Sequence, residues 1–231
     1  MDTSLDAVKR ENARALADPE AYWREAAAAL DWSTRHGPVF EPMADPPFGR
    51  WFAGWTTNLA ANAIDRNLAK GLGAKVAYYW EGENGDRRTV RYAELAKDMH
   101  RWATVFLEAG VRPGDRITIY LPMIPELPAA MLASARIGAV HSVVFAGFSD
   151  QALAGRIQDS ESRLVVTADG GYRRGKVLPL KEIVDRAIRE CPSVTRVVTV
   201  RRTGRPVETS PSRDVWFDSQ RSVADVPAVP R

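Results

Sequence analysis

From Arg112 onward, short apolar runs alternate with amphipathic segments, and this alternation constrains the fold more than any other feature. The intervening segments at 126–139, 149–161 and 178–191 have helical character, and Ser149 can cap the second of them. The apolar runs lack the alternation of half-exposed strands, which is typical of parallel strands covered by helices on both faces. The runs are DRITIYLP (115–122), AVHSVVF (139–145), RLVVTAD (163–169) and TRVVTVRR (195–202). The sequence therefore predicts an α/β fold with a parallel sheet and right-handed crossovers.

The part of the chain before this alternation predicts helices and an aromatic wrapping segment. Residues 1–30 are expected to be helical, with Asp18 capping a helix that begins at Pro19. Residues 31–57 are dense in Pro, Gly and Trp, and their tryptophans are expected to pack within the chain. A partner-binding patch is the alternative. Residues 58–70 have helical spacing and can end at Gly71.

A hairpin, a long helix and an irregular tail complete the expected elements. The apolar and β-branched residues on either side of ENGD (83–86) predict a β-hairpin. An amphipathic helix should follow at 94–110. Residues 203–231 are rich in Pro and Ser and are expected to contain no further strand or helix. We thus expect an N-terminal helical and wrapping segment (1–75), a partial α/β domain (76–218) and a loose tail (219–231).

Composition excludes several classes of function. The 231 residues carry a net charge of +3, and Lys and Arg form no long runs, so a nucleic-acid surface is not expected. Apolar runs stay well below the ~20 residues of a membrane span, and the polar N-terminus does not resemble a signal peptide. We therefore expect no membrane partner and a cytoplasmic protein. The single cysteine and three scattered histidines form no cluster with metal-ligand spacing, so no metal site is expected.

Three loops should form one binding site. Ligands of open parallel sheets bind at the carboxyl ends of the strands, where LPMIPE (121–126), FAGFSD (145–150) and DGGYRRGK (169–176) are expected. The third loop is nearly the pattern G-x-x-x-x-G-K-[ST], but Val177 has no hydroxyl for Mg²⁺ and Pro179 falls where a helix should begin. A P-loop NTPase is therefore disfavoured. Arg173, Arg174 and Lys176 suit a metal-free phosphate clamp, with an ordinary solvated basic loop as the alternative.

Residues 119–176 resemble the AMP-forming acyl-CoA synthetases, in particular the acetyl-CoA and propionyl-CoA synthetases. The motifs MIPE, ARIGAVHSVVF, GFS, L-x-x-RI-x-D and TADGG-x-R-x-GK arrive in order at family spacing. The segments AYWREAA, NLAANAIDRNLAK and TVRYAEL resemble the leading part of the same family. The resemblance implies the first subdomain of an adenylate-forming enzyme. It also implies a two-step ligation in which acetate and ATP give acetyl-AMP and pyrophosphate, and the CoA thiol then attacks the adenylate.

The resemblance also implies roles for particular residues. Arg173 and Lys176 would hold the 3′-phosphate end of CoA, with Arg174 and Gly175 between them. Phe145, Ala146 and Gly147 would line the path of the pantetheine arm, although the family usually has Gly where Ala146 stands. The implied small-molecule substrates are acetate or propionate, ATP and CoA.

The family's Thr/Ser/Gly-rich phosphate loop, Y-T-S-G-[ST]-T-G-x-P-K-G, does not occur in the 231 residues. The sites for ATP and Mg²⁺ and the catalytic lysine of the family are therefore not expected here, and no catalytic residue is assigned. The expectation is an N-terminal fragment of a short-chain acyl-CoA ligase that is inactive by itself. A non-catalytic protein that binds CoA, or pairs with a second chain completing the domain, is the alternative.

Overall fold

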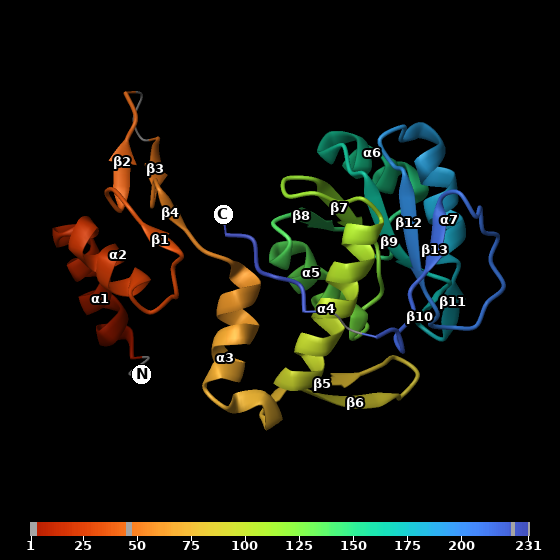
Figure 1. Cartoon of the computed structure of the whole chain (residues 1–231), viewed down its shortest axis with the longest axis horizontal. Helices are drawn as coiled ribbons and strands as arrows, with labels where there is room; N and C mark the ends of the chain where they lie inside the picture. Colours follow the sequence, from red (N-terminus) through yellow and green to blue (C-terminus); the bar gives the residue numbers. More distant parts are fainter. Residues whose placement is uncertain (1–3, 45–47, 223–224, 231) are drawn as a thin grey trace. The chain divides into compact units, whose positions relative to one another are not determined.

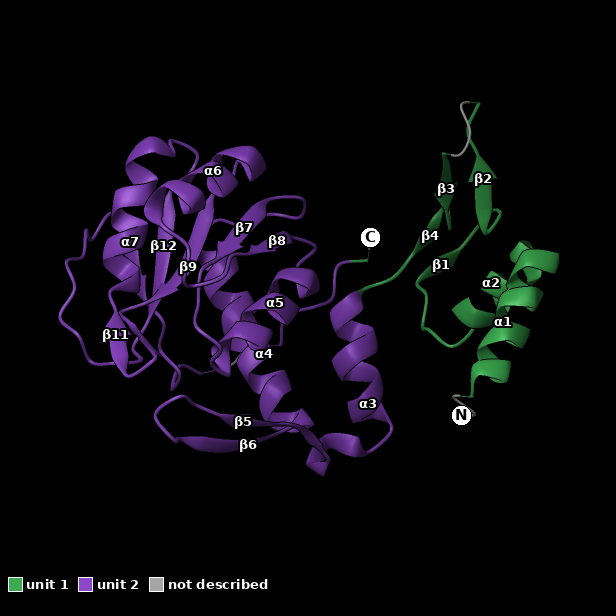
Figure 2. Ribbon diagram, turned by 180° about the vertical axis from the view of Figure 1, so that it is seen from behind, with its two compact units in different colours: residues 1–58, 230–231 green, residues 59–229 purple. Residues whose placement is uncertain are grey.

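The computed structural model describes residues 4–44, 48–222 and 225–230. Figure 2 colours two compact units, residues 1–58 with 230–231 and residues 59–229. These units are groups of residues whose backbones lie close together. They do not test the expected domain boundaries at residues 75 and 218, which stay predictions.

The first unit contains two helices and two small sheets. Its elements are α1 (Leu5–Ala17), α2 (Pro19–Ala27), β1 (Thr34–Arg35), β2 (Phe40–Pro42), β3 (Gly49–Trp51) and β4 (Trp55–Thr56). Asp18 accepts a hydrogen bond from the Ala21 amide at 3.0 Å, and Pro19 is the first helical residue, as predicted. The tryptophans pack on one another within this unit: the Trp32 and Trp55 rings lie edge to face at 5.1 Å.

The second unit begins with helical turns, a hairpin and a long helix. The expected helix at 58–70 contains a π-helical turn (Ala61–Asp65) followed by α3 (Arg66–Ala69), and Gly71 ends it at φ +73°. A short 3₁₀ turn (Leu72–Ala74) leads into the predicted hairpin, formed by β5 (Val76–Glu81) and β6 (Arg87–Arg91). Helix α4 (Tyr92–Glu108) follows directly.

The rest of the second unit is the predicted parallel sheet with its helices (Figure 1). All neighbouring strands in the order β13-β12-β9-β7-β8 run parallel. The chain passes from β7 to β8 on one side of β7, and then back to β9 and β12 on its other side. Because the crossovers are right-handed, this change of direction places α5 on one face of the sheet and α6 and α7 on the other. The bounds are β7 (Arg116–Ile119), α5 (Glu126–Arg136), β8 (Val140–Val143), α6 (Asp150–Ser160), β9 (Leu164–Ala168), α7 (Leu180–Ala187) with a 3₁₀ turn (Ile188–Glu190), β12 (Arg196–Val200) and β13 (Asp214–Trp216).

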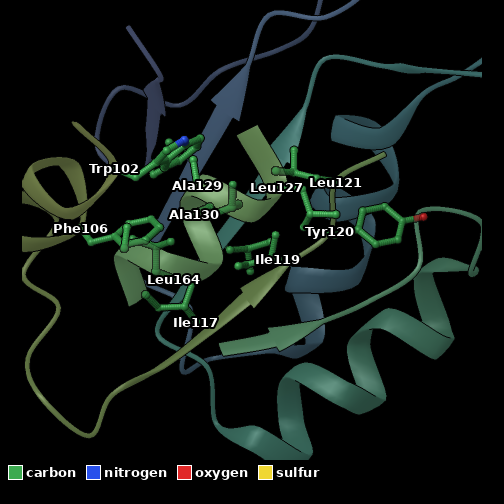
Figure 3. Packing of buried hydrophobic residues seen from close by; sticks show 14 of the residues in the cluster. Trp102, Phe106, Ile117, Ile119, Tyr120, Leu121, Leu127, Ala129, Ala130 and Leu164 are labelled. Atoms are coloured by element: carbon green, nitrogen blue, oxygen red, sulfur yellow. The ribbon is translucent and has the colours of Figure 1, made fainter. Parts of the chain in front are cut away.

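The core lies between the sheet and its helices. In Figure 3, Trp102 and Phe106 of α4 and Ala129 and Ala130 of α5 pack over Ile119 of β7, and all five are fully buried. Burying side chains of this size is the main favourable contribution to folding. The core is therefore formed largely by the apolar residues of α4 and of the alternating strands and helices that follow it, as their spacing predicted.

Burial on both faces holds for the central strands but not for β8. Every residue of β9 is buried, as predicted. Among the residues that the structure describes, strand β8 pairs with β7 alone, and its Val140 and Val143 are 53% and 45% exposed. These side chains are exposed because β8 lies at the edge of the sheet, where a strand has a neighbour on one side only.

The prediction of no further strand after residue 203 was wrong. Strand β13 pairs in parallel with β12, with Val215 opposite Val198. The side chain of its first residue, Asp214, is 2% exposed and is ion-paired with Lys181 of α7 and with its neighbour Arg213. Burial alone would raise the pKa of Asp214, but hydrogen bonds from Arg213 and the Ser210 amide and the charge of Lys181 lower it. This three-residue strand depends on contacts with distant residues, which local patterns do not reveal.

Candidate functional site

The loops after β7, β8 and β9 meet at the carboxyl edge of the sheet, as predicted. With the tip of the β5–β6 hairpin and Arg202 they line a cavity of ≈ 440 Å³. Among its lining residues are Pro122, Met123 and Ile124 after β7, Phe145 and Ala146 after β8, and Gly171, Tyr172, Arg173 and Arg174 after β9. The cavity is large enough for part of a small-molecule ligand.

The turn after β8 is held in place by a hydrogen bond from Tyr120. This tyrosine is buried, and its hydroxyl donates a hydrogen bond to the Phe148 carbonyl at 2.8 Å. Burial, with a smaller effect of the Asp150 charge, raises the pKa of Tyr120 to about 12, so the hydroxyl keeps its proton at neutral pH. Ser149 caps α6 by accepting from the Ala152 amide at 3.3 Å. The turn therefore presents the half-exposed Phe145 ring on a fixed backbone.

Arg173 joins the second and third loops. Its guanidinium carbon lies 4.7 Å from the centre of the Phe145 ring, within the range of a cation–π contact. A Cβ atom on Gly147 would lie 1.8 Å from Arg173 Nη1, so only glycine permits this approach. The fold brings together an aromatic ring, a glycine and a guanidinium group, and the arrangement leaves Arg173 partly exposed beside the cavity.

The basic loop is a hairpin, which the sequence analysis did not predict. Strands β10 (Gly171–Arg173) and β11 (Lys176–Leu178) pair antiparallel, with Arg173 opposite Lys176. Arg174 and Gly175 form the two-residue turn, at φ +50° and +71°. Positive φ at both positions is the mark of a type I′ turn, and the Gly in its second position was the available signal. The hairpin places Arg173 and Lys176 side by side.

Asp169, at the end of β9, fixes the hairpin to the sheet. Its buried carboxylate accepts hydrogen bonds from the amides of Gly170, Arg202, Thr203 and Gly204 at 2.7–2.9 Å. Hydrogen bonds to a charged group are the strong ones, and a buried carboxylate requires them. Asp169 therefore positions the glycines at the start of the hairpin without lining the cavity.

The β5–β6 hairpin and Arg202 are site residues that the sequence analysis missed. The Arg202 guanidinium donates to Asp86 and Asn84, each at 2.9 Å, and lies 5.2 Å from the ring centres of Trp80 and Tyr172. Hydrogen bonds from Asn84 and Arg202 lower the pKa of Asp86. Arg202 closes the strand run TRVVTVRR, and a fourth strand end at the same edge was the signal that could have found it.

The predicted site residues do not all take the same position. Phe145, Ala146, Arg173 and Arg174 line the cavity. Gly147 contacts Arg173, whereas Gly175 and Lys176 lie exposed at the hairpin turn beside the cavity mouth. The cavity lining combines cationic side chains with apolar and aromatic ones. Contact of any of these residues with CoA stays a prediction.

The described part of the chain shows neither a cluster of metal ligands nor a membrane-spanning helix. Within residues 4–44, 48–222 and 225–230, no three His, Cys, Asp or Glu side chains gather closely enough to hold a metal ion. None of the helices described there combines the length and apolar character needed to cross a membrane.

These features define a class: an α/β protein with a cavity at the carboxyl edge of a parallel sheet and a basic hairpin beside it. Residues 65–230 match the family model described as AMP-binding enzyme, and residues 8–63 match the one described as acetyl-coenzyme A synthetase N-terminus. The chain therefore belongs to the AMP-binding enzyme family, in its acetyl-CoA synthetase branch, and the predicted family is confirmed.

Individual relatives agree with this assignment. The chain is 49% identical over 204 residues to acetyl-coenzyme A synthetase of Streptomyces coelicolor, covering 88% of this chain and 31% of that protein. It is 45% identical over 226 residues to the Syntrophus aciditrophicus enzyme of the same name, covering 96% and 35%. The Mycolicibacterium smegmatis enzyme of that name is 47% identical over 220 residues, covering 94% and 23%. The chain thus spans about a quarter to a third of the length of these curated relatives.

A solved structure supports the fold in the same way. Acetoacetyl-CoA synthetase from Streptomyces lividans superposes with a TM-score of 0.81 at 25% identity, covering 92% of this chain and 32% of that one. The predicted fold class, a parallel α/β sheet preceded by a helical, Trp-rich extension, is confirmed.

Proposed function

We propose that these residues form the CoA-binding part of an AMP-forming acetate–CoA ligase. The whole protein would convert ATP, acetate and CoA to AMP, pyrophosphate and acetyl-CoA through acetyl-adenylate. Propionate or another short-chain acid is the alternative acyl substrate. The observation that carries the proposal is the placement of Arg173, stacked on Phe145 and fitted against Gly147 at the cavity edge.

In this proposal the cavity holds the end of CoA that does not react. The guanidinium of Arg173 and the ammonium of Lys176 would neutralise the 3′-phosphate, and Arg174 would add a third cation. Phe145 and Ala146 would give the pantetheine arm an apolar wall. Ala146 is buried, so its methyl group takes less space from the pantetheine arm than an exposed side chain would.

Replacing the proposed phosphate contact should weaken CoA binding selectively. Arg173→Ala is expected to raise the Kd for CoA by about 10- to 150-fold, since a hydrogen bond to a charged group is worth about 1.5–3 kcal/mol. Gly147→Ala should also weaken binding, because its Cβ would displace Arg173. Isothermal titration with CoA and 3′-dephospho-CoA measures both effects.

Arg189→Ala is the matched control, because Arg189 is exposed and does not line the cavity. It should leave both Kd values unchanged. Equal affinity of the unaltered protein for CoA and 3′-dephospho-CoA would contradict a clamp for the 3′-phosphate.

The 231 residues by themselves are not expected to form the adenylate. They contain no Thr/Ser/Gly-rich phosphate loop, and adenylation depends on aligning the carboxylate with the α-phosphate. Acetate-dependent exchange of labelled pyrophosphate into ATP should stay at background. A rate above background that requires acetate would show that the sequence holds an adenylating site after all.

Pairing with a second chain is the other candidate, and the exposed edge strand β8 favours it. An unpaired edge with exposed Val140 and Val143 offers both backbone hydrogen bonds and apolar surface. A partner that adds a strand there would complete the sheet.

A further inference from the structure

The turn of the β10–β11 hairpin offers a backbone donor that its own hairpin does not use. Arg174 is the first turn residue, and the ladder pairs only the residues from Gly171 to Arg173 with those from Lys176 to Leu178. A free amide next to Arg173 and Lys176 is a place where an anion gains both a hydrogen bond and cationic neighbours.

An acidic side chain from the other hairpin already takes this donor. The Arg174 amide donates to the carboxylate of Glu83, which lies 91 residues earlier in the chain. Glu83 stands at the tip between β5 and β6, and Arg202 anchors that tip through the neighbouring Asn84 and Asp86. Glu83 also lines the cavity together with Arg173 and Arg174. The contact therefore bridges the two hairpins at the cavity mouth.

A carboxylate and a phosphate monoester seek the same partners. Each accepts hydrogen bonds from backbone amides and guanidinium groups, and each is negatively charged. Two such anions cannot share one amide without repulsion. A phosphate that reaches the turn must either displace Glu83 or bind beside its negative charge.

We infer that Glu83 is an internal competitor for the phosphate position of the basic hairpin, and that it sets the affinity and selectivity for phosphate-bearing ligands. This inference rests on the proposed function, since it takes the 3′-phosphate of CoA as the group that competes. Displacing Glu83 would separate the hairpin tips, so ligand binding and opening of the cavity mouth would be coupled.

Removing the charge of Glu83 should improve binding of the phosphate. Glu83→Gln keeps the shape and an acceptor oxygen, and is expected to lower the Kd for CoA by about three- to tenfold, because a carboxylate beside a bound phosphate repels it even in water. The Kd for 3′-dephospho-CoA should stay unchanged. Inorganic phosphate, titrated as a competitor, shows whether a free phosphate gains from the substitution as well.

Glu81→Gln is the matched control. It removes the same charge from the same hairpin, and Glu81 also lines the cavity, but its carboxylate is paired with Arg87 at 3.0 Å, whereas that of Glu83 accepts from the Arg174 amide. A change of less than about twofold in this variant, beside a clear gain in Glu83→Gln, supports the direct contact. Equal gains in both variants, or no gain in Glu83→Gln, would overturn the inference while leaving CoA binding intact.

A second readout needs no ligand. Hydrogen exchange at the Arg174 amide, followed by NMR, should be faster in Glu83→Ala than in the unaltered protein and unchanged in Glu81→Ala. Unchanged exchange in Glu83→Ala would overturn the inference independently of CoA. If CoA binds none of the variants, the proposed function fails, and the displacement of Glu83 by CoA fails with it.

Discussion

Lys181→Ala is expected to lower the free energy of unfolding by about 3–5 kcal/mol, because it removes the fully buried cation that pairs with Asp185 and with the buried carboxylate of Asp214. Lys181 is fully buried in α7, and its Nζ lies 2.7 Å from both oxygens of Asp185 and 3.4 Å from Asp214. Arg213 contacts the same two carboxylates, but its side chain is 31% exposed, whereas that of Lys181 is fully buried. Urea unfolding followed by circular dichroism measures the loss.

Two further substitutions separate charge from packing in this cluster. Lys181→Met retains an unbranched apolar stem of similar volume, so a comparable loss in this variant identifies the missing charge as the cause. Lys97→Ala, on the exposed side of α4, should stay within about 0.5 kcal/mol. A loss below about 1 kcal/mol in Lys181→Ala would mean that the ion cluster does not hold β13 to α7.

Asp169→Ala is expected to cost about 2–4 kcal/mol, since four backbone amides lose their acceptor at once. The substitution should also weaken CoA binding, because the loop at 202–204 and the start of the basic hairpin lose their common support. Thermal unfolding and the CoA titration test the two effects separately.

The isosteric variant sharpens this second experiment. Asp169→Asn keeps the size of the side chain but turns one acceptor into a donor that faces amide donors, so it should be destabilising as well. Asp159→Ala, exposed on α6, is the control and should change neither stability nor binding. A stable Asp169→Ala protein with unchanged CoA affinity would show that the four amides find other acceptors.

Sequence patterns predicted the elements whose stability is local. The caps at Asp18 and Ser149, the stop at Gly71 and the hairpin around ENGD all depend on residues within a few positions of one another. The patterns failed where distant residues decide the structure. Strand β13 has only three residues, and its Asp214 becomes stable in the interior through Lys181, 33 positions earlier.

The same division applies to the candidate site. Parallel strands bring their carboxyl ends to one edge, so the meeting of the loops at 121–126, 145–150 and 169–176 followed from the predicted sheet. The strand end at Arg202 could have placed this residue at the same edge, but not its contacts, and Glu83 could not be assigned in this way at all. Their importance lies in the contacts that they make with another hairpin: Arg202 donates to the side chain of Asn84, and Glu83 accepts from the backbone amide of Arg174. No local spacing encodes these contacts.

By itself, the sequence determined the parallel α/β sheet, the family and the placement of a basic segment at the carboxyl edge of that sheet. It could do so because periodicity, turn residues and motif spacing are properties of neighbouring residues. Only the tertiary structure decided that Arg173 stacks on Phe145 against Gly147, that Asp169 gathers four amides, and that Glu83 occupies the amide of Arg174. Apart from Gly170, which directly follows Asp169, these contacts join residues separated by 26 to 91 positions, and packing of the whole unit sets which of them meet.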